Sequence, residues 1–283
     1  MKEKYAVAVD IGTSGIRAQA LDLESSKVLS TAITLRHPLP GANVVDHLDF
    51  AIRVGRDTAH KLLIDTVNKV VKSLDLDLEN VERLAVCGNP IQLSIFQNIE
   101  IRDLAYWGQN ALERLHVTPP SRNSTITKPE DVGLEINPEA EVYIPPAIKH
   151  EIGADALAML FKSGVLEKKG IYLVSDFGTN AEIALVVDGK VYSCSAAAGP
   201  AIEGQMIEKG RLASPGTICD FEFAGSGWKA MILDDDLMVQ NGNVVNPEDG
   251  KTFLKSGMDG KRLGLNQHMN QLRFFRNQLI RIM

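Results

Sequence analysis

The sequence contains little cysteine. It has three cysteines among 283 residues, and Cys87, Cys194 and Cys219 are too far apart to form a CxxC pair. Structural zinc sites and iron–sulfur clusters are normally held by cysteines at close spacing. We therefore expect no zinc site and no iron–sulfur cluster in this chain, and we interpret each cysteine as a small buried thiol.

Long apolar runs and an excess of positive charge are also lacking. Nowhere do eighteen apolar residues follow one another, and the apolar run near the N-terminus is broken by Asp10, so neither a membrane span nor a signal peptide is expected. The formal net charge of -6 and the absence of a basic stripe before residue 260 argue against nucleic acid as a partner. These properties indicate a cytoplasmic protein, and its 45% hydrophobic composition suffices for one large or two medium domains.

An internal repeat is the most informative feature that is present. Residues 7–22 (VAVDIGTSGIRAQALD) align with residues 173–188 (LVSDFGTNAEIALVVD) at an offset of 166 residues, which is 176 minus 10. Each copy is an apolar run that reaches an Asp-x-Gly-Thr turn and resumes as an alternating strand, the pattern of a β-hairpin. So large an offset favours two duplicated lobes, which we place at residues 1–150 and 151–283. The aligned pairs are Asp10 and Asp176, Gly12 and Gly178, Thr13 and Thr179, Ser14 and Asn180, and Asp22 and Asp188.

The turn from Asp10 to Gly15 suits a polyphosphate. Its glycines, Gly12 and Gly15, let backbone N–H groups approach anionic oxygens, and the hydroxyl groups of Thr13 and Ser14 add donors. A carboxylate such as Asp10 or Asp176 can hold a water of hydrated Mg²⁺, which keeps several of its waters when bound. A single such turn is often a plain hairpin, so the prediction of a phosphate clamp depends on the paired occurrence.

Other segments predict secondary structure without chemistry. Residues 57–74 have the apolar spacing of an amphipathic helix, and residues 81–87 read as a strand that Gly88-Asn89-Pro90 ends. The Pro-rich residues 117–147 predict an irregular surface excursion, and residues 153–164 predict a helix with a glycine stop.

We predict no binding site from two short motifs near residue 240, an acidic run and a turn-like pair. We interpret Asp234-Asp235-Asp236 as a solvated loop rather than a metal site, and Asn241-Gly242 as the turn of an exposed hairpin.

With these motifs, the sequence resembles the superfamily of actin, heat-shock chaperones and sugar kinases. The resemblance implies an α/β, two-lobed actin-like ATPase (ribonuclease H-like) fold that binds ATP and Mg²⁺ between its lobes, with Asp10 to Gly15 and Asp176 to Asn180 as the two phosphate motifs. It further implies that Asp155, nine residues before Gly164, orients the attacking water or a metal-bound water. Alternatively, Asp155 is a carboxylate favoured at a helix N-terminus.

A narrower resemblance begins at Ser193. The segment SCSAAAGPAIEGQMIEKGRLASPGTI is similar to the hallmark segment of the ATP-dependent reductive activators of corrinoid proteins, and residues 41–50 and 228–236 look most like the archaeal branch called methanogenesis marker protein 14. The resemblance covers roughly residues 5–220. It implies that Gly199, Glu203 and Gly204 open a helix whose N-terminus faces the nucleotide; the alternative is a turn that only packs the lobe.

The sequence departs from that family in two ways. It has no cysteines for the family's iron–sulfur module, and no Gly-rich adenosine-binding segment follows before the chain ends in LNQHMNQLRFFRNQLIRIM after Gly264. We therefore expect an incomplete second lobe with an atypical tail, which either docks on the protein or meets a partner or membrane surface.

The sequence leaves three functions open. The leading hypothesis is an ATPase that couples lobe closure to activation or remodelling of a partner, a corrinoid protein or methyltransferase component. A small-molecule kinase of the same superfamily is the first alternative, and a nucleotide-binding protein without turnover is the second. The sequence also leaves a homodimer open.

Overall fold

The computed structural model describes residues 3–34, 36–41, 43–105, 108–147, 153–198, 218–224, 227–233 and 239–245. The chain divides into two compact units, Met1–Val174 with Ile183–Cys194, and Ser175–Glu182 with Ser195–Met283. The boundary that we placed at residue 150 stays a prediction. The first nine strands are β1 (Tyr5–Ile11), β2 (Ile16–Asp22), β3 (Val28–Ile33), β4 (Val81–Gly88), β5 (Thr125–Thr127), β6 (Glu141–Ile144), β7 (Ile171–Phe177), β8 (Asn180–Val187) and β9 (Lys190–Ala197). The α-helices are α1 (Val44–Val54), α2 (Arg56–Lys72), α3 (Pro90–Phe96), α4 (Arg102–Ala105), α5 (Gln109–Arg114), α6 (Pro129–Val132) and α7 (Ala154–Ser163).

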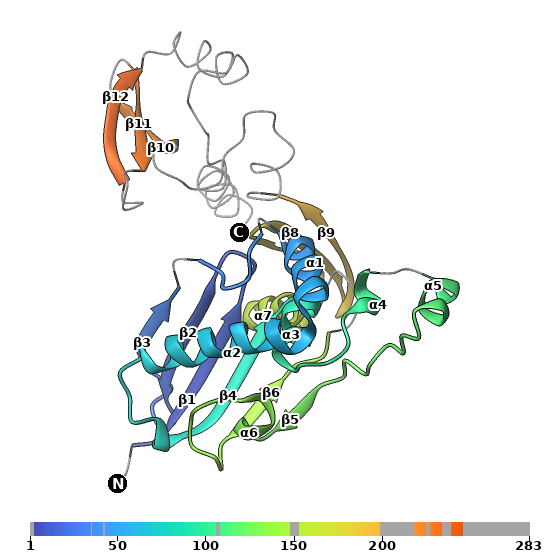
Figure 1. Ribbon diagram of the computed structural model, residues 1–283. Helices are drawn as coiled ribbons and strands as arrows, with labels where there is room; N and C mark the ends of the chain where they lie inside the picture. Colours follow the sequence, from blue (N-terminus) through green and yellow to red (C-terminus); the bar gives the residue numbers. More distant parts are fainter. Residues whose placement is uncertain are drawn as a thin grey trace. The chain divides into compact units, whose positions relative to one another are not determined.

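A six-stranded sheet in the order β3-β2-β1-β4-β6-β5 forms the centre of the first unit (Figure 1). Strand β1 runs antiparallel to β2 and parallel to β4, and β4 runs parallel to β6. Side chains of β1 alternate, so that Val7, Val9 and Ile11 are at most 2% exposed while Ala8 between them is exposed. This mixed α/β sheet confirms the expected fold class; an incomplete second lobe stays a prediction.

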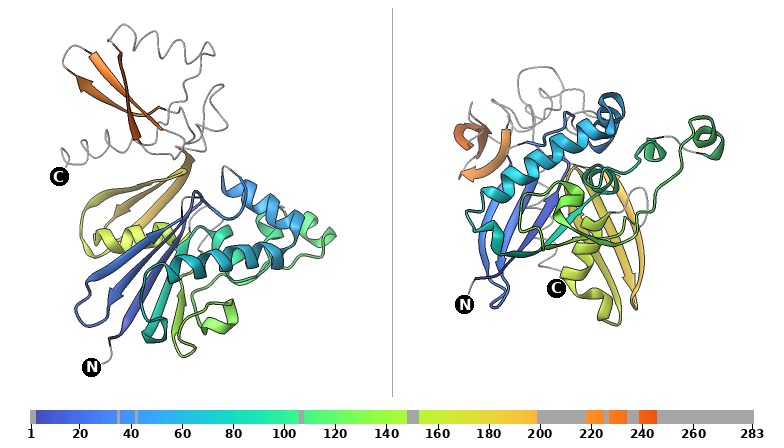
Figure 2. Two further views of the ribbon diagram at one scale, coloured as in Figure 1. Left: turned by 60° about the vertical axis from the view of Figure 1, so that its left-hand side comes forward. Right: turned by 60° about the horizontal axis from the view of Figure 1, so that its bottom comes forward.

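Helices cover both faces of this sheet (Figure 2). Helix α2 confirms the amphipathic helix expected at residues 57–74, and its apolar side packs into the core through Leu63, Val67 and Val71. Helix α1 starts at a capping box, in which Asn43 Oδ1 accepts a hydrogen bond from the Asp46 N–H at 2.9 Å. On the opposite face, α7 packs against β4.

Helix α7 belongs to two hydrophobic clusters. Its first residue, Ala154, is part of the main core, whereas Leu160 joins a second cluster with Val165, Ala184 and Val186. The second cluster lies on one face of a sheet with the order β7-β8-β9. The helix ends at Gly164, whose φ of 64° is left-handed, so the glycine stop is confirmed.

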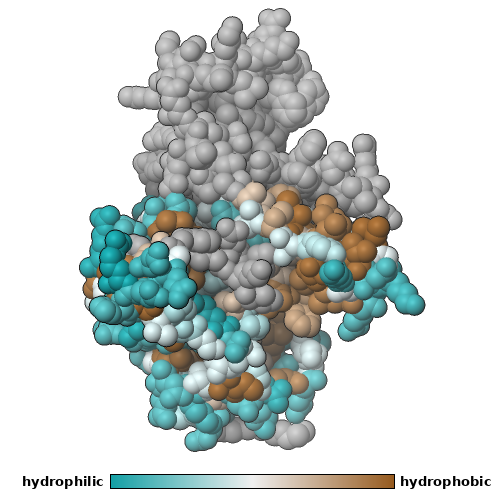
Figure 3. All heavy atoms as spheres, turned by 90° about the vertical axis from the view of Figure 1, so that its right-hand side faces the viewer, coloured by the Kyte–Doolittle hydropathy of each residue, from teal (hydrophilic) through white to brown (hydrophobic). Residues whose placement is uncertain are grey.

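The other face of the β7-β8-β9 sheet is apolar and open among the described residues. Ile171 is 74% exposed, Leu173 63% and Tyr192 51%. Figure 3 shows that hydrophobic residues gather in one area of the described surface, while hydrophilic residues cover other parts of it.

The expectation for residues 117–147 was wrong. This segment contains β5, α6 and β6. Strand β6 extends the central sheet by pairing parallel to β4, and its residues Val142 and Ile144 are at most 2% exposed. Proline assisted this structure, since Pro129 occupies the first turn of α6, where its missing N–H costs no hydrogen bond.

A third sheet contains β10 (Ile218–Ala224), β11 (Gly227–Leu233) and β12 (Val239–Val245). Asn241 and Gly242 lie inside β12, with Asn241 opposite Met231, so their expected hairpin turn was also wrong. The strand pairing of β12 with β11 overrode the local turn preference. The acidic run Asp234 to Asp236 and residues 265–283 lie outside the described residues. Among the helices that the structure describes, none is both long and apolar enough to cross a membrane.

Candidate nucleotide site

The first Asp-x-Gly-Thr turn lies between β1 and β2. Asp10, in β1, is paired across the ladder with Arg17 in β2, and their side chains form an ion pair of 3.6 Å between Oδ2 and Nη1. The Asp10 carboxylate is 40% exposed and its Oδ1 lies 3.9 Å from the Cys87 Sγ atom on the neighbouring strand β4. Asp10 is therefore held at a sheet end while remaining accessible.

The glycines of this turn allow close backbone packing. A Cβ atom on Gly15 would lie 2.9 Å from Thr34 Oγ1, and the same hydroxyl group accepts a hydrogen bond from the Ile16 N–H at 2.8 Å. A Cβ atom on Gly12 would lie 3.1 Å from the Gly15 carbonyl oxygen. The turn is thus compact, with Thr13 half-buried and Ser14 exposed, and no side chain projects from either glycine.

The end of β4 lies beside this turn, because Gly88 is paired with Ile11 in the parallel ladder. The next residue, Asn89, caps α3: its Oδ1 accepts hydrogen bonds from the N–H groups of Ile91 at 3.1 Å and Gln92 at 3.0 Å. From the sequence, Gly88-Asn89-Pro90 was predicted only to end the strand. The Asn-Pro pair, a favoured N-cap followed by a favoured first helical residue, was the available signal for the helix.

Asp155 lies in the first turn of α7, close to the end of β4. Its Oδ1 accepts a hydrogen bond from the Ala156 N–H at 2.9 Å, as a helix N-terminal carboxylate does. The preceding Gly153 touches the backbone of Gly88 and Asn89. The structure therefore brings Asp10 and Asp155 to the same end of the β1–β4 pair, within one compact unit.

The second Asp-x-Gly-Thr turn joins β7 to β8 through Gly178 and Thr179. Asp176 is exposed, the Gly178 N–H donates to the Asn180 carbonyl oxygen at 2.7 Å, and Thr179 O accepts from the Ala198 N–H at 3.2 Å. This turn belongs to the second compact unit. The expected strand-turn-strand form is present in both copies of the repeat. Gly199, Glu203 and Gly204 lie outside the described residues.

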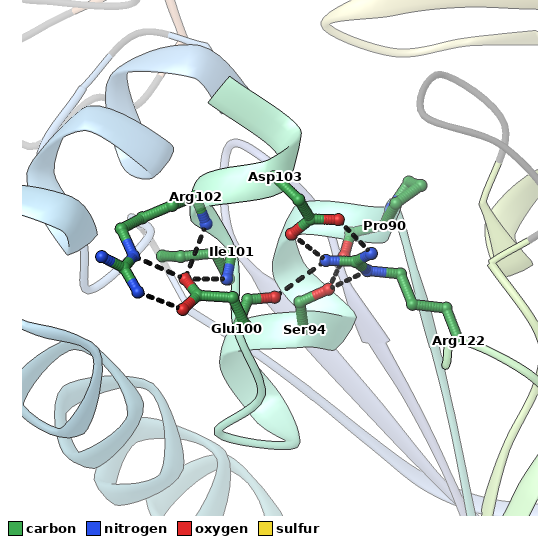
Figure 4. A network of polar contacts seen from close by, with 7 residues as sticks. All are labelled: Pro90, Ser94, Glu100, Ile101, Arg102, Asp103 and Arg122. Carbon is green, nitrogen blue, oxygen red and sulfur yellow. Dashed lines mark hydrogen bonds and ion pairs between the residues drawn. The ribbon is translucent and has the colours of Figure 1, made fainter. Parts of the chain in front are cut away.

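Behind α3, a buried ion pair joins three segments of the first unit (Figure 4). Arg122 donates to both carboxylate oxygens of Asp103, at 2.7 and 2.9 Å, and to Ser94 Oγ at 2.9 Å and the Glu100 carbonyl oxygen at 2.8 Å. The side chains of Arg122 and Asp103 are only 12% and 7% exposed. Ser94 in turn donates to Pro90 O at 2.6 Å, so the network fixes the helix that Asn89 caps.

Next to Arg122, a second ion pair joins Glu100 and Arg102, with 2.6 Å between Oε2 and Nη2. The hydrogen bond from Arg102 is the main reason that the pKa of Glu100 is lowered to about 2. Neither pair was predicted from the sequence, and the partners of Arg122 are brought together only by the fold.

Two histidines, the half-buried His37 and the buried His47, form a stack near α3. The rings of His37 and His47 are 4.1 Å apart between centroids and inclined by 15°. Burial lowers the pKa of His37 to about 3 and that of His47 to about 4. Gln92 Nε2 lies 2.7 Å from His47 Nδ1.

Direct metal ligation is not built into the described part of the chain, where no group of three or more His, Cys, Asp or Glu residues could hold a metal ion. A hydrated Mg²⁺ fits the Asp10 carboxylate better, since it needs few protein ligands and the carboxylate is partly exposed beside a side-chain-free turn.

Comparison with known proteins identifies the family. Residues 5–168 match the model of the RACo middle region, and residues 170–241 match that of the C-terminal domain of RACo, the ASKHA domain. A [Co(II) methylated amine-specific corrinoid protein] reductase of Methanosarcina barkeri is 50% identical over 248 residues, covering 87% of this chain and 46% of the relative. The corrinoid activation enzyme RamQ of Eubacterium limosum is 28% identical, covering 86% of this chain and 44% of the relative.

A solved structure agrees with these relatives. The reductive activator for corrinoid, iron-sulfur protein superposes with a TM-score of 0.65 at 26% identity, covering 82% of this chain and 37% of that chain. The chain thus spans less than half the length of the curated relatives that it matches. By its two matching regions and its 50% identity to one member, the chain belongs to the RACo family of reductive activators of corrinoid proteins, with an actin-like ATPase (ASKHA) fold.

Proposed function

We propose that the chain binds ATP with Mg²⁺ and hydrolyses it to drive the activation of a corrinoid protein. The observation that carries the proposal is the repeated Asp-x-Gly-Thr turn at Asp10 and Asp176, in a chain that matches the ASKHA domain. Gly12 to Gly15 of the first turn and Gly178 to Asn180 of the second would each bind phosphate groups, and the family resemblance adds Gly199, Glu203 and Gly204 as nucleotide-binding residues.

In ATP hydrolysis, these residues would position the reactants and neutralise charge, and no covalent intermediate with the protein is required. Magnesium, when bound, neutralises charge on the phosphate oxygens, and Asp10 and Asp176 would hold it through its waters. Asp155 would orient the attacking water, whose oxygen forms the bond to the γ-phosphorus while the bond to the bridging oxygen breaks, giving ADP and phosphate. Its hydrogen bond from the Ala156 N–H would hold the carboxylate in place for this task.

The partner is inferred from the relatives. The Methanosarcina barkeri relative is described as acting on a methylated amine-specific corrinoid protein, and half of the aligned residues are identical. We propose a corrinoid protein of this kind as the partner, within methyl-transfer chemistry associated with methanogenesis and in the cytoplasm. With three separated cysteines, the chain would provide the ATPase and depend on an electron source elsewhere.

Matched aspartate variants test the proposal. Asp22 and Asp188 are also equivalent in the repeat, but their side chains bind backbone groups. Asp22 Oδ1 accepts a hydrogen bond from the Ser25 N–H at 2.6 Å, and Asp188 Oδ1 accepts one from the Gly170 N–H at 2.8 Å. Phosphate release and calorimetric ATP-Mg²⁺ binding would be measured for Asp10→Asn and Asp176→Asn, with Asp22→Asn and Asp188→Asn as controls. We expect about a hundredfold loss of hydrolysis in the first pair only.

The alternatives give different results in the same samples. Tight binding without hydrolysis by the wild type, with and without a corrinoid protein, would indicate a nucleotide-binding protein without turnover. ADP release that depends on a small metabolite would indicate a kinase. Absence of any nucleotide binding contradicts the proposal altogether.

A further inference from the structure

Three backbone segments meet beside Asp10 with no side chain between them. A Cβ atom on Gly88 would lie 2.8 Å from the Ile11 carbonyl oxygen. One on Gly153 would lie 2.5 Å from the Gly88 carbonyl oxygen and 2.6 Å from the Asn89 Cα atom. We call this stack of Ile11, Gly88 and Gly153 the glycine seam. It joins the ends of β1 and β4 to the start of α7.

Space, not backbone conformation, requires glycine at position 153. Its φ of -101° and ψ of -167° are extended and open to any amino acid. The contacts at 2.5 and 2.6 Å, by contrast, are shorter than real Cβ atoms tolerate, and the opposing atoms belong to rigid backbone. An alanine at this position must therefore push α7 away from β4.

The seam also comes at a local cost to the helix. Gly153 is the N-cap of α7 and provides no side-chain hydrogen bond, whereas Ser, Asn or Asp there would typically add about a few tenths of a kcal/mol. Gly153 thus serves the close approach of the backbone segments rather than the capping of the helix.

Asp155 is the polar group that the seam positions. It lies two residues after Gly153, and its Oδ1 would be 2.8 Å from a Cβ atom on Gly153. At the other end of the seam, Ile11 directly follows Asp10 in β1. The remainder of α7 is held independently by Leu160 in the second cluster. A shift at the seam would thus move Asp155 relative to Asp10 while the helix stays folded.

We propose that Gly153 is a positioning residue, which sets the place of the Asp155 carboxylate beside Asp10 through the glycine seam. This inference rests on the proposed ATPase function and adds to it a determinant of turnover that does not touch the nucleotide. It predicts a loss of turnover without a comparable loss of nucleotide affinity.

The test compares two glycines at the two ends of α7. Gly153→Ala should lower the kcat of phosphate release at least tenfold while the Kd for ATP-Mg²⁺ changes less than threefold. Gly164→Ala is the control, because no atom lies within 4 Å of its Cβ position, although its φ of 64° makes the substitution cost stability. It should lower the melting temperature and leave kcat within twofold. Equal kcat in wild type and Gly153→Ala, or equal losses in both variants, overturns the proposal.

Two further variants separate positioning from general damage. In an Asp155→Asn background, Gly153→Ala should cause no additional loss of kcat, since the group through which it acts is already gone. An additional tenfold loss there contradicts the route through Asp155. If Gly153→Ala fails to fold, Asp155→Glu replaces it: the seam stays intact, the carboxylate moves by one methylene group, and unchanged kcat overturns the proposal. Wild-type protein that binds but never hydrolyses ATP instead rejects the proposed function, and this role with it.

Discussion

The two copies of the repeat share a sequence pattern but not their surroundings. Val7 in β1 and Leu173 in β7 occupy the same position of the repeat, yet Val7 is 1% exposed and Leu173 is 63% exposed. The first turn is supported by a sheet with helices on both faces, whereas the described part of the second has α7 on one face and an open apolar face on the other. The same apolar pattern therefore predicts a strand in both copies, but it does not predict which faces of that strand are covered by other parts of the protein.

The largest difference in stability between the two regions should come from the buried ion pair of the first. Arg122→Ala leaves Asp103 as an unpaired buried carboxylate, so we expect a loss of about 3–5 kcal/mol in the free energy of unfolding. Urea unfolding measures this loss. Lys128→Ala is the control, because its ion pair with Glu139 is exposed, and a loss there as large as that at Arg122 would disprove the distinction between the pairs.

Acid should weaken the first region selectively, because the chain has no histidine between residues 151 and 267. Burial holds the pKa of His37 and His47 at about 3 and about 4, so protons bind the unfolded state first as the pH falls below the ordinary pKa of 6.5. Stability is full above that pH and should fall by about 1.4 kcal/mol per pH unit for each histidine between about pH 6 and pH 4.

Urea unfolding at pH 7, 6 and 5 checks this dependence. His37→Ala removes one of the two groups, so the slope against pH should fall by about half; an unchanged slope would show that other groups cause it. The Asp46 carboxylate next to His47 acts in the opposite direction, since its charge raises the pKa of that histidine.

The repeat itself offers a matched pair of truncations. Val7→Ala removes buried methyl groups and should cost roughly 2 kcal/mol, whereas Leu173→Ala should stay within about 0.5 kcal/mol. A cost at Leu173 close to that at Val7 would show that the open face of the β7-β8-β9 sheet is covered in solution.

The sequence predicted elements well where a local pattern is sufficient. The apolar spacing of residues 57–74, the glycine stop at Gly164 and both strand-turn-strand repeats correspond to structure. Residues 117–147 and Asn241-Gly242 were misjudged because pairing with distant strands outweighed proline and turn preferences. The glycine seam and the ion pair of Arg122 could not be predicted, since both depend on distances between segments far apart in the chain.

The smallest expected effect concerns a difference between the two turns. Arg17 pairs with Asp10, whereas the residue at the same offset in the second copy is Ile183. Because the pair is exposed, Arg17→Ala should change the free energy of unfolding by less than about 0.5 kcal/mol. Removing this competing cation should lower the half-saturating Mg²⁺ concentration for hydrolysis about twofold, and a rise instead would mean that Arg17 assists nucleotide binding.

Helix α7 packs into two hydrophobic clusters, so it connects the central sheet to the β7-β8-β9 sheet. A helix of 10 residues is roughly 15 Å long, and α7 is packed near both of its ends. If Asp155 acts as proposed, a displacement of its carboxylate would strain the start of α7, whose other end contacts the β7-β8-β9 sheet through Leu160. Phe161 on α7 is 74% exposed, so a spectroscopic probe at this position would report movement of the helix.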